Sequence, residues 1–159
     1  MRHFDKKGLE GLPLKLMIIF LILSLTMPIL IENAEYYDTL VIKKNLIIEA
    51  EKIRKGAYSV YLSGPENLRT INVEIPKGTF GQVCRLEFGG GINDSASLMI
   101  KCFINDDLCG TIILDNPRIS IVSNSGQPIV IENDSIKLSL SCVEIDRSRF
   151  VQAEVISLD

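Results

Sequence analysis

The strongest constraint on the fold is an unbroken apolar run near the amino terminus, residues 12–31, which reads LPLKLMIIFLILSLTMPILI. The hydrocarbon core of a bilayer is about 30 Å thick, and roughly 20 helical residues cross it at about 1.5 Å per residue. This run has that length, whereas the remainder of the 159-residue chain has the mixed composition of a soluble domain. The sequence therefore predicts one membrane-spanning helix and one aqueous domain.

The run does not resemble a signal peptide that signal peptidase removes. Such a peptide has an apolar core of about 7 to 15 residues, followed by small residues at the cleavage site. This run is longer, and Glu32 stands where a small residue is required. The helix is therefore expected to be retained. Arg2, Lys6 and Lys7 precede it, and because basic flanks stay in the cytoplasm, the C-terminal domain is expected outside the cell.

Two residues within the run affect its helical structure. Lys15 lies about one turn from the start, so its stem can follow the apolar surface while its ammonium group reaches the interface. Pro28 removes the backbone hydrogen bond to residue 24 and bends the helix, and the hydroxyls of Ser24 and Thr26 are candidates to satisfy the freed groups. Two interpretations stay open, a kinked anchor and a flexible point that lets packed helices bend.

The helical pattern continues beyond the membrane run. From Tyr36 to Tyr61, apolar residues recur at intervals of three and four, with charged residues between them. Gly64 and Pro65 are typical of a helix end, since glycine adopts the left-handed cap and proline cannot continue the helix. The sequence predicts one helix over residues 12–62, apolar on all sides at first and then amphipathic.

After residue 65 the spacing of apolar residues changes to two. Alternating runs lie at residues 70–75, 82–88, 97–104, 108–114, 119–123, 129–132, 136–145 and 150–157. Asn, Asp, Gly and Pro residues separate these runs and favour turns. About eight short strands at this spacing predict an antiparallel sandwich or an open barrel. The expected fold class is α+β, a long N-terminal helix followed by an antiparallel β-sandwich-like head.

All cysteines fall in the predicted strands of the outer domain, as expected for structural disulfides of an exported protein. They are Cys84, Cys102, Cys109 and Cys142. If Asn105 and Asp106 form a two-residue turn, Cys102 and Cys109 lie opposite each other, which predicts a disulfide between them. Cys84 and Cys142 are then the remaining pair. A Cys84–Cys102 bond is also geometrically possible, and the sequence does not choose among the three connectivities.

Two glycosylation sequons occur in predicted turns of the outer domain. They begin at Asn93 and Asn133, within Asn93-Asp94-Ser95 and Asn133-Asp134-Ser135. Both modified asparagines and unmodified Asn-Asp turns are compatible with the sequence.

The sequence offers no arrangement for catalysis. The only histidine, His3, precedes the membrane run, so a Ser/His/Asp or Cys/His site cannot form in the outer domain. Asp106 and Asp107 are typical of a turn rather than of a carboxylate pair. The cysteine spacing lacks the CxxC of zinc sites, and a net charge of −3 without a basic patch disfavours nucleic acid. We expect no enzyme activity, cofactor, metal or nucleic-acid partner.

A basic leader that ends in Lys6-Lys7-Gly8, followed by LEGLPLKL and a retained apolar helix, resembles the class III signal sequence of archaeal type IV pilins and pilin-like proteins. In that family, a membrane prepilin peptidase cuts after the glycine on the cytoplasmic side. The apolar helix then packs into the filament core. The resemblance implies cleavage between Gly8 and Leu9. It also implies a leader at residues 1–8, a helix at 9–64 with its span at about 12–31, and an extracellular head at 65–159.

The chain departs from the family pattern near the cut. Many type IV pilins carry a glutamate at the fifth residue after it, whereas here Glu10 would be the second residue and Pro13 the fifth. The usual contact between that glutamate and a neighbour's amino terminus is therefore not assured for Glu10. Two alternatives remain, a cut after Gly11 and a helix that is never cut.

The resemblance implies a structural subunit, major or minor, of an archaeal type IV pilus-like surface filament of the kind used in cell adhesion. Its partners would be the membrane, the prepilin peptidase, and copies of itself or other pilins. The expected assembly helix includes Glu10, Lys15, Leu16, Ile19, Leu23, Thr26 and Pro28. The subunit would lie in the cell membrane, with its head outside, before it joins the filament. The main alternative is an uncleaved, anchored β-domain that binds an envelope or motility-machine partner; an anchored extracellular enzyme is a third class.

Overall fold

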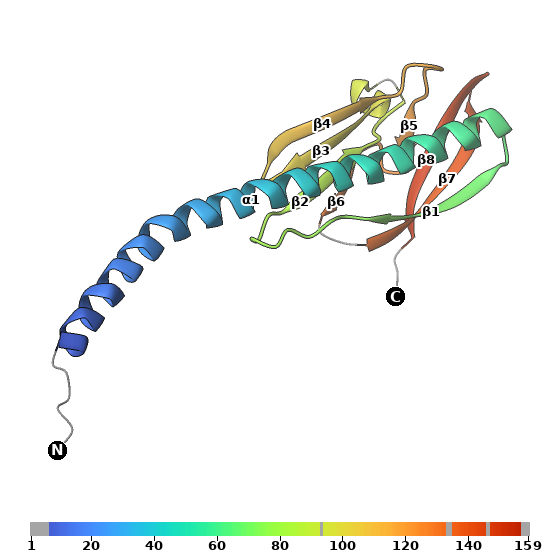
Figure 1. Cartoon of the computed structure of the whole chain (residues 1–159). Coiled ribbons are helices and arrows are strands. Elements are labelled where there is room, and N and C mark those ends of the chain that lie inside the picture. The colour runs from blue at the N-terminus through green and yellow to red at the C-terminus, as the bar shows by residue number, and fades with distance from the viewer. Residues whose placement is uncertain (1–6, 93, 133–134, 146, 157–159) are drawn as a thin grey trace. The chain divides into compact units, whose positions relative to one another are not determined.

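The structure is a computed structural model that describes residues 7–92, 94–132, 135–145 and 147–156, with side chains described from Pro13 onward. One long helix, α1 (Lys7–Ser63), precedes two four-stranded sheets (Figure 1). This confirms the expected α+β class and the continuous N-terminal helix. The chain divides into two compact units, Met1–Asp38 and Thr39–Asp159, and each is described by itself.

The first unit consists, in its described part, of the N-terminal half of α1. Every side chain from residue 13 to residue 37 is exposed. The proline at position 28 leaves the carbonyl of Ser24 without its helical donor. The Ser24 hydroxyl donates to the carbonyl of Leu21 at 2.9 Å, and the Thr26 hydroxyl donates to that of Ile22 at 3.0 Å. The two hydroxyls therefore bond to carbonyls one turn upstream instead of the carbonyl that Pro28 frees.

The second unit contains all the described strands, and each alternating run of the sequence overlaps one of them. The elements are β1 (Leu68–Glu74), β2 (Cys84–Phe88), the 3₁₀ helix η1 (Ser95–Leu98), β3 (Met99–Ile104), β4 (Asp107–Ile113), β5 (Ile121–Ser123), β6 (Ile129–Glu132), β7 (Ser135–Ile145) and β8 (Ser148–Ile156). The strand order is β1-β7-β8-β5 in one sheet and β4-β3-β2-β6 in the other.

One strand pair corrects the expectation of purely antiparallel sheets. β5 runs parallel to β8, with Ile121 opposite Val151, whereas the other described strand pairs are antiparallel. Between these two strands the chain forms β6 in the other sheet and then β7. A parallel pair needs such a long connection, and the local alternation of a strand does not reveal its direction.

The two sheets and the second half of α1 share one hydrophobic core, which is compatible with a sandwich-like head. The buried helix residues recur at intervals of three and four: Ile42, Leu46, Ala50, Ile53, Ala57 and Val60. They join buried residues of both sheets, such as Leu86 and Leu140. The compact unit accordingly begins at Thr39, and residues 39–63 of the helix are part of it.

α1 also covers one edge of each sheet. β1 is an edge strand, and its Asn72 carbonyl accepts a hydrogen bond from Lys52 Nζ at 3.1 Å. β4 is an edge strand of the other sheet, and a Cβ atom added to its Gly110 would lie 3.5 Å from Ile47 Cγ1. Covering the edges in this way protects the sheets from pairing with other chains.

The helix ends as the sequence predicts. Gly64 has a φ of 87°, the left-handed conformation that glycine adopts without strain. The side-chain amide of Asn67 donates to the carbonyl of Ser63 at 2.8 Å, which satisfies a carbonyl at the end of α1.

Candidate functional site

The expected processing residues lie at the start of the described chain. Lys6 is outside the described residues. Lys7, Gly8, Leu9 and Glu10 are within α1, but their side chains are outside the described part. Among the described residues α1 begins at Lys7, so the expected cleavage site after Gly8 lies in its first turn.

The expected assembly residues from position 15 onward are all exposed on α1. Leu16, Ile19 and Leu23 are 47%, 51% and 47% exposed. Together with Thr26 they follow one another at intervals of three and four, which places them on one helical face. Removing a leucine or isoleucine side chain from water is favourable by about 1.5–3 kcal/mol of free energy. This helical face is therefore expected to contact lipid or another apolar surface rather than water.

The whole first half of α1 shares this property. The helix is long and apolar enough to cross a membrane, and the most apolar stretch is not buried by any described part of the chain. Lys15 and Pro28 lie in the same exposed segment. The segment is thus a candidate membrane anchor, and its apolar side chains are not covered by any described part of the chain.

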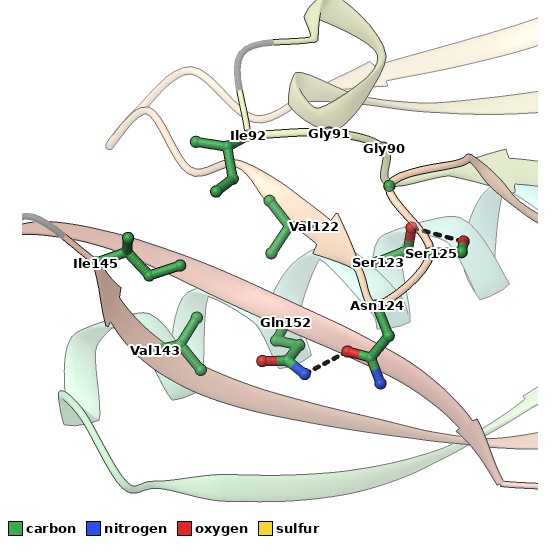
Figure 2. Close-up of a pocket in the computed structure, with 11 residues that line it drawn as sticks. Gly90, Gly91, Ile92, Val122, Ser123, Asn124, Ser125, Val143, Ile145 and Gln152 are labelled. Carbon is green, nitrogen blue, oxygen red and sulfur yellow. Dashed lines mark hydrogen bonds between the residues drawn. The ribbon is translucent and has the colours of Figure 1, made fainter.

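The head contains an open hollow of about 510 Å³ at one end of β5 (Figure 2). Its lining comes from the loop after β2, from β5 and the turn that follows it, and from β7 and β8: Gly90, Gly91, Ile92, Val122, Ser123, Asn124, Ser125, Gly126, Val143, Ile145 and Gln152. The Gln152 amide donates to Asn124 Oδ1, and the hydroxyls of Ser123 and Ser125 lie 3.3 Å apart (Figure 2).

The lining of this hollow offers hydrogen-bonding groups and apolar side chains. None of the lining residues is an acid, a base or a cysteine. A serine hydroxyl becomes a useful nucleophile only beside a general base, and no such group lines the hollow. Its backbone is held in place by the Ser123 N–H, which donates to the Gly90 carbonyl at 3.2 Å.

The β3–β4 hairpin confirms the expected turn and corrects the expected cysteine register. Asn105 and Asp106 form the two-residue turn with φ values of 50° and 67°, as the favoured hairpin turns require. A β-bulge then shifts the register between Cys102 and Phe103, so Cys102 lies opposite Gly110 and not opposite Cys109. The bulge adds one extra residue to β4. Pairing residues outward from the turn one by one does not allow for it, so that procedure places Cys109 opposite Cys102.

No disulfide is present in the described residues, which include all four cysteines. Burial raises the pKa of the Cys102 thiol to about 12, and the nearby Cys109 adds to the shift. Burial also raises the pKa of Cys109, an effect that the ammonium of Lys43 partly offsets. Burial likewise raises the pKa of Cys142, against the lowering effect of Arg149. All three thiols are therefore kept protonated near neutral pH.

Asp106 takes part in an ion pair in addition to the turn. Arg85 Nη1 lies 2.9 Å from Asp106 Oδ1 and 3.6 Å from Glu132 Oε1. The guanidinium stacks over the Phe103 ring, with 4.6 Å between its central carbon and the ring centroid. These contacts support the interpretation of Asp106 as a structural residue. Within the described chain, no three metal-binding side chains come together.

Several relevant residues were not anticipated from the sequence. The hollow combines four separate segments, so no local motif identifies it. Glu49 and Lys52 counted only among the charged residues of the helical pattern, although both contact β1. Tyr36 and Tyr37 counted only toward helical periodicity, yet they form an exposed pair just after the apolar run. The sequon residues Asn93 and Asn133 lie outside the described residues.

Comparison of the chain with protein-family models, with curated proteins and with solved structures finds no match.

Proposed function

We propose that this chain is a structural subunit of a type IV pilus-like surface filament, cleaved after Gly8 and assembled through α1. One observation carries the proposal. An exposed apolar helical segment, residues 13–37, continues into a helical segment whose side chains are part of the core of a folded head. Such a chain combines an apolar helical segment with a folded domain, as a subunit of a filament with a helical core requires.

The assembly step is a change of surroundings for the apolar segment. In the membrane, lipid surrounds Leu16, Ile19 and Leu23; in a filament, the helices of neighbouring subunits replace the lipid. Because lipid tails are as apolar as leucine, close packing and hydrogen bonds between helices have to drive this exchange. The hydroxyls of Ser24 and Thr26 already bond within their own helix, so packing does not leave them unsatisfied.

The head would then form the outer surface of the filament. Its hollow contains hydrogen-bonding groups and apolar side chains but no acid or base, which suits adhesion better than catalysis. An extracellular, sandwich-like head would also be open to glycosylation at Asn93 and Asn133, and it would fold in an oxidising environment, where disulfides can form.

Cleavage is the step to test first. Intact mass and N-terminal sequencing of the protein from its own cells would be compared among the wild type, Gly8→Val and Gly11→Val. We expect a terminus at Leu9 in the wild type and in Gly11→Val, and an uncleaved terminus in Gly8→Val. The matched glycine variant controls for a general effect of valine near the membrane. The intact mass also records any glycan or disulfide.

Filament recovery completes the test. Sheared cell-surface material should contain the wild-type chain and lack the Gly8→Val chain, which should stay in the membrane fraction. A terminus at Met1 or Arg2 in all three proteins would overturn the proposal. The chain would then be an anchored β-domain whose partner binds the head.

A further inference from the structure

Two neighbouring tyrosines lie just beyond the apolar run and are exposed. Tyr36 and Tyr37 are 62% and 66% exposed, and their rings meet edge to face with centroids 6.1 Å apart. The residues between the end of the run and this pair are polar or small: Glu32, Asn33, Ala34 and Glu35. The aromatic pair therefore follows the point where the helix stops being suited to hydrocarbon.

Lys15 marks the other end of the same segment. About 31 Å of helix separates Lys15 from Tyr36 at about 1.5 Å per residue, so the lysine ammonium and the tyrosine rings can reach the opposite interfaces of a bilayer whose core is roughly 30 Å thick. Helical side chains lean toward the amino terminus of the helix, so the tyrosine rings reach back toward the apolar run. The lysine stem leans in the same direction, away from the bilayer centre.

Polar groups near the tyrosines are compatible with a membrane boundary. The side-chain amide of Asn33 donates to the carbonyl of Ile29 at 2.7 Å, within the same helix. Placing a polar side chain at the edge of the hydrocarbon costs less free energy when the side chain hydrogen-bonds to its own helix than when it has no partner. The segment between Ile31 and Tyr36 thus has the properties of an interfacial zone.

We infer that Tyr36 and Tyr37 are an interfacial anchor, with their rings among the glycerol and headgroup atoms of the outer leaflet. Tyrosine suits this zone because its ring is apolar and its hydroxyl is polar, and aromatic residues are enriched there. Together with Lys15, the pair fixes how deeply α1 sits in the bilayer. The inference rests on the membrane insertion that the proposed function requires before assembly, and on neither cleavage nor filament formation.

The chain contains no tryptophan, so a single introduced tryptophan reports the depth of one position. The full chain would be reconstituted at low density in phosphatidylcholine vesicles that contain lipids brominated either near the glycerol or near the chain end. The reporters are Tyr36→Trp and Tyr37→Trp. The controls are Phe20→Trp, within the apolar run, and Ile48→Trp, an exposed residue of the head unit. If an introduced tryptophan moved the helix to the interface by itself, the shallow bromines would quench Ile48→Trp as well.

We expect Tyr36→Trp and Tyr37→Trp to be quenched at least about twofold more by the shallow bromines than by the deep ones. Phe20→Trp should show the opposite preference, and Ile48→Trp should be quenched by neither. Two results would overturn the inference. In the first, neither lipid quenches the emission of Tyr36→Trp and Tyr37→Trp. In the second, the deep bromines quench both variants more than the shallow ones do. The assay contains no peptidase and no filament, so its outcome is independent of the cleavage test.

Discussion

The carboxylate of Glu49 on α1 accepts a hydrogen bond from the backbone N–H of Glu74 on β1, with 3.2 Å between the nitrogen and Oε2. The same oxygen lies 2.7 Å from Lys52 Nζ, which in turn donates to the Asn72 carbonyl. Two side chains on adjacent turns of the helix thus bind backbone groups of an edge strand. The helix therefore covers β1 with polar contacts as well as apolar ones.

Replacing Glu49 with alanine should loosen this edge. We expect Glu49→Ala to lower the free energy of unfolding by roughly 0.5–1.5 kcal/mol, because the Glu74 N–H loses its acceptor and Lys52 its partner. Chemical denaturation of the full chain in detergent measures the loss, and hydrogen exchange of the Glu74 amide should be faster. Glu51→Ala is the matched control, since Glu51 pairs with Arg54 on the same helix. Similar values for the two variants would argue against the edge contact.

The second half of α1 should behave as part of the head core. Ile53 is fully buried and Ile48 is 50% exposed, although both are isoleucines on the same helix. We expect Ile53→Ala to lower the free energy of unfolding by about 2–5 kcal/mol through the cavity it leaves. Ile48→Ala should cost less than about 1 kcal/mol. Thermal or chemical unfolding of the full chain distinguishes them, and equal losses would mean that this part of the helix is not integrated into the core.

Periodicity explains why much of the fold could be predicted. Spacings of three and four in residues 36–61 and of two after residue 65 are set by local geometry, and the sequence alone carries them. Long-range features were missed for the opposite reason. The parallel pairing of β5 with β8 depends on how distant segments meet, and the bulge beside Cys102 depends on one extra residue in β4.

Of the two candidate sites, only the apolar helical segment could be predicted, because its amino-acid composition alone identifies it. The apolar segment that contains Leu16, Ile19 and Leu23 stands out in any hydropathy analysis, and the structure confirms its exposure on a helix. The hollow beside Gln152 could not be predicted, because four segments that are far apart in the sequence line it. Its residue types are common in turns and strands, so they carry no signal before the chain is folded.

Gly56 sets how closely α1 approaches the first sheet. A Cβ atom at this position would lie 2.9 Å from Leu140 Cδ1 and 3.5 Å from Ile71 Cδ1. We expect Gly56→Leu to destabilise the chain by about 1–3 kcal/mol through overpacking. Gly56→Ala should have a smaller effect, because its gain in helix propensity of about 1 kcal/mol offsets part of the crowding. Denaturation midpoints test the order of the two variants, and a neutral Gly56→Leu would show that the helix can move away from Leu140.

Because of Cys102, the free energy of unfolding of the reduced protein should fall as the pH rises through the alkaline range. Its pKa is about 12 in the folded chain against 9.0 for an unperturbed thiol, so the unfolded chain loses this proton first. The contribution to stability is complete below about pH 9 and is lost as the pH rises toward 12, at up to about 1.4 kcal/mol per pH unit. Unfolding of the full chain would be measured between pH 8 and pH 10.5 with a reductant present. Cys102→Ala removes this group while leaving the other titrating side chains, so its stability should fall less steeply than that of the wild type. Parallel slopes would mean that Cys102 ionises as readily in the folded chain as in the unfolded one.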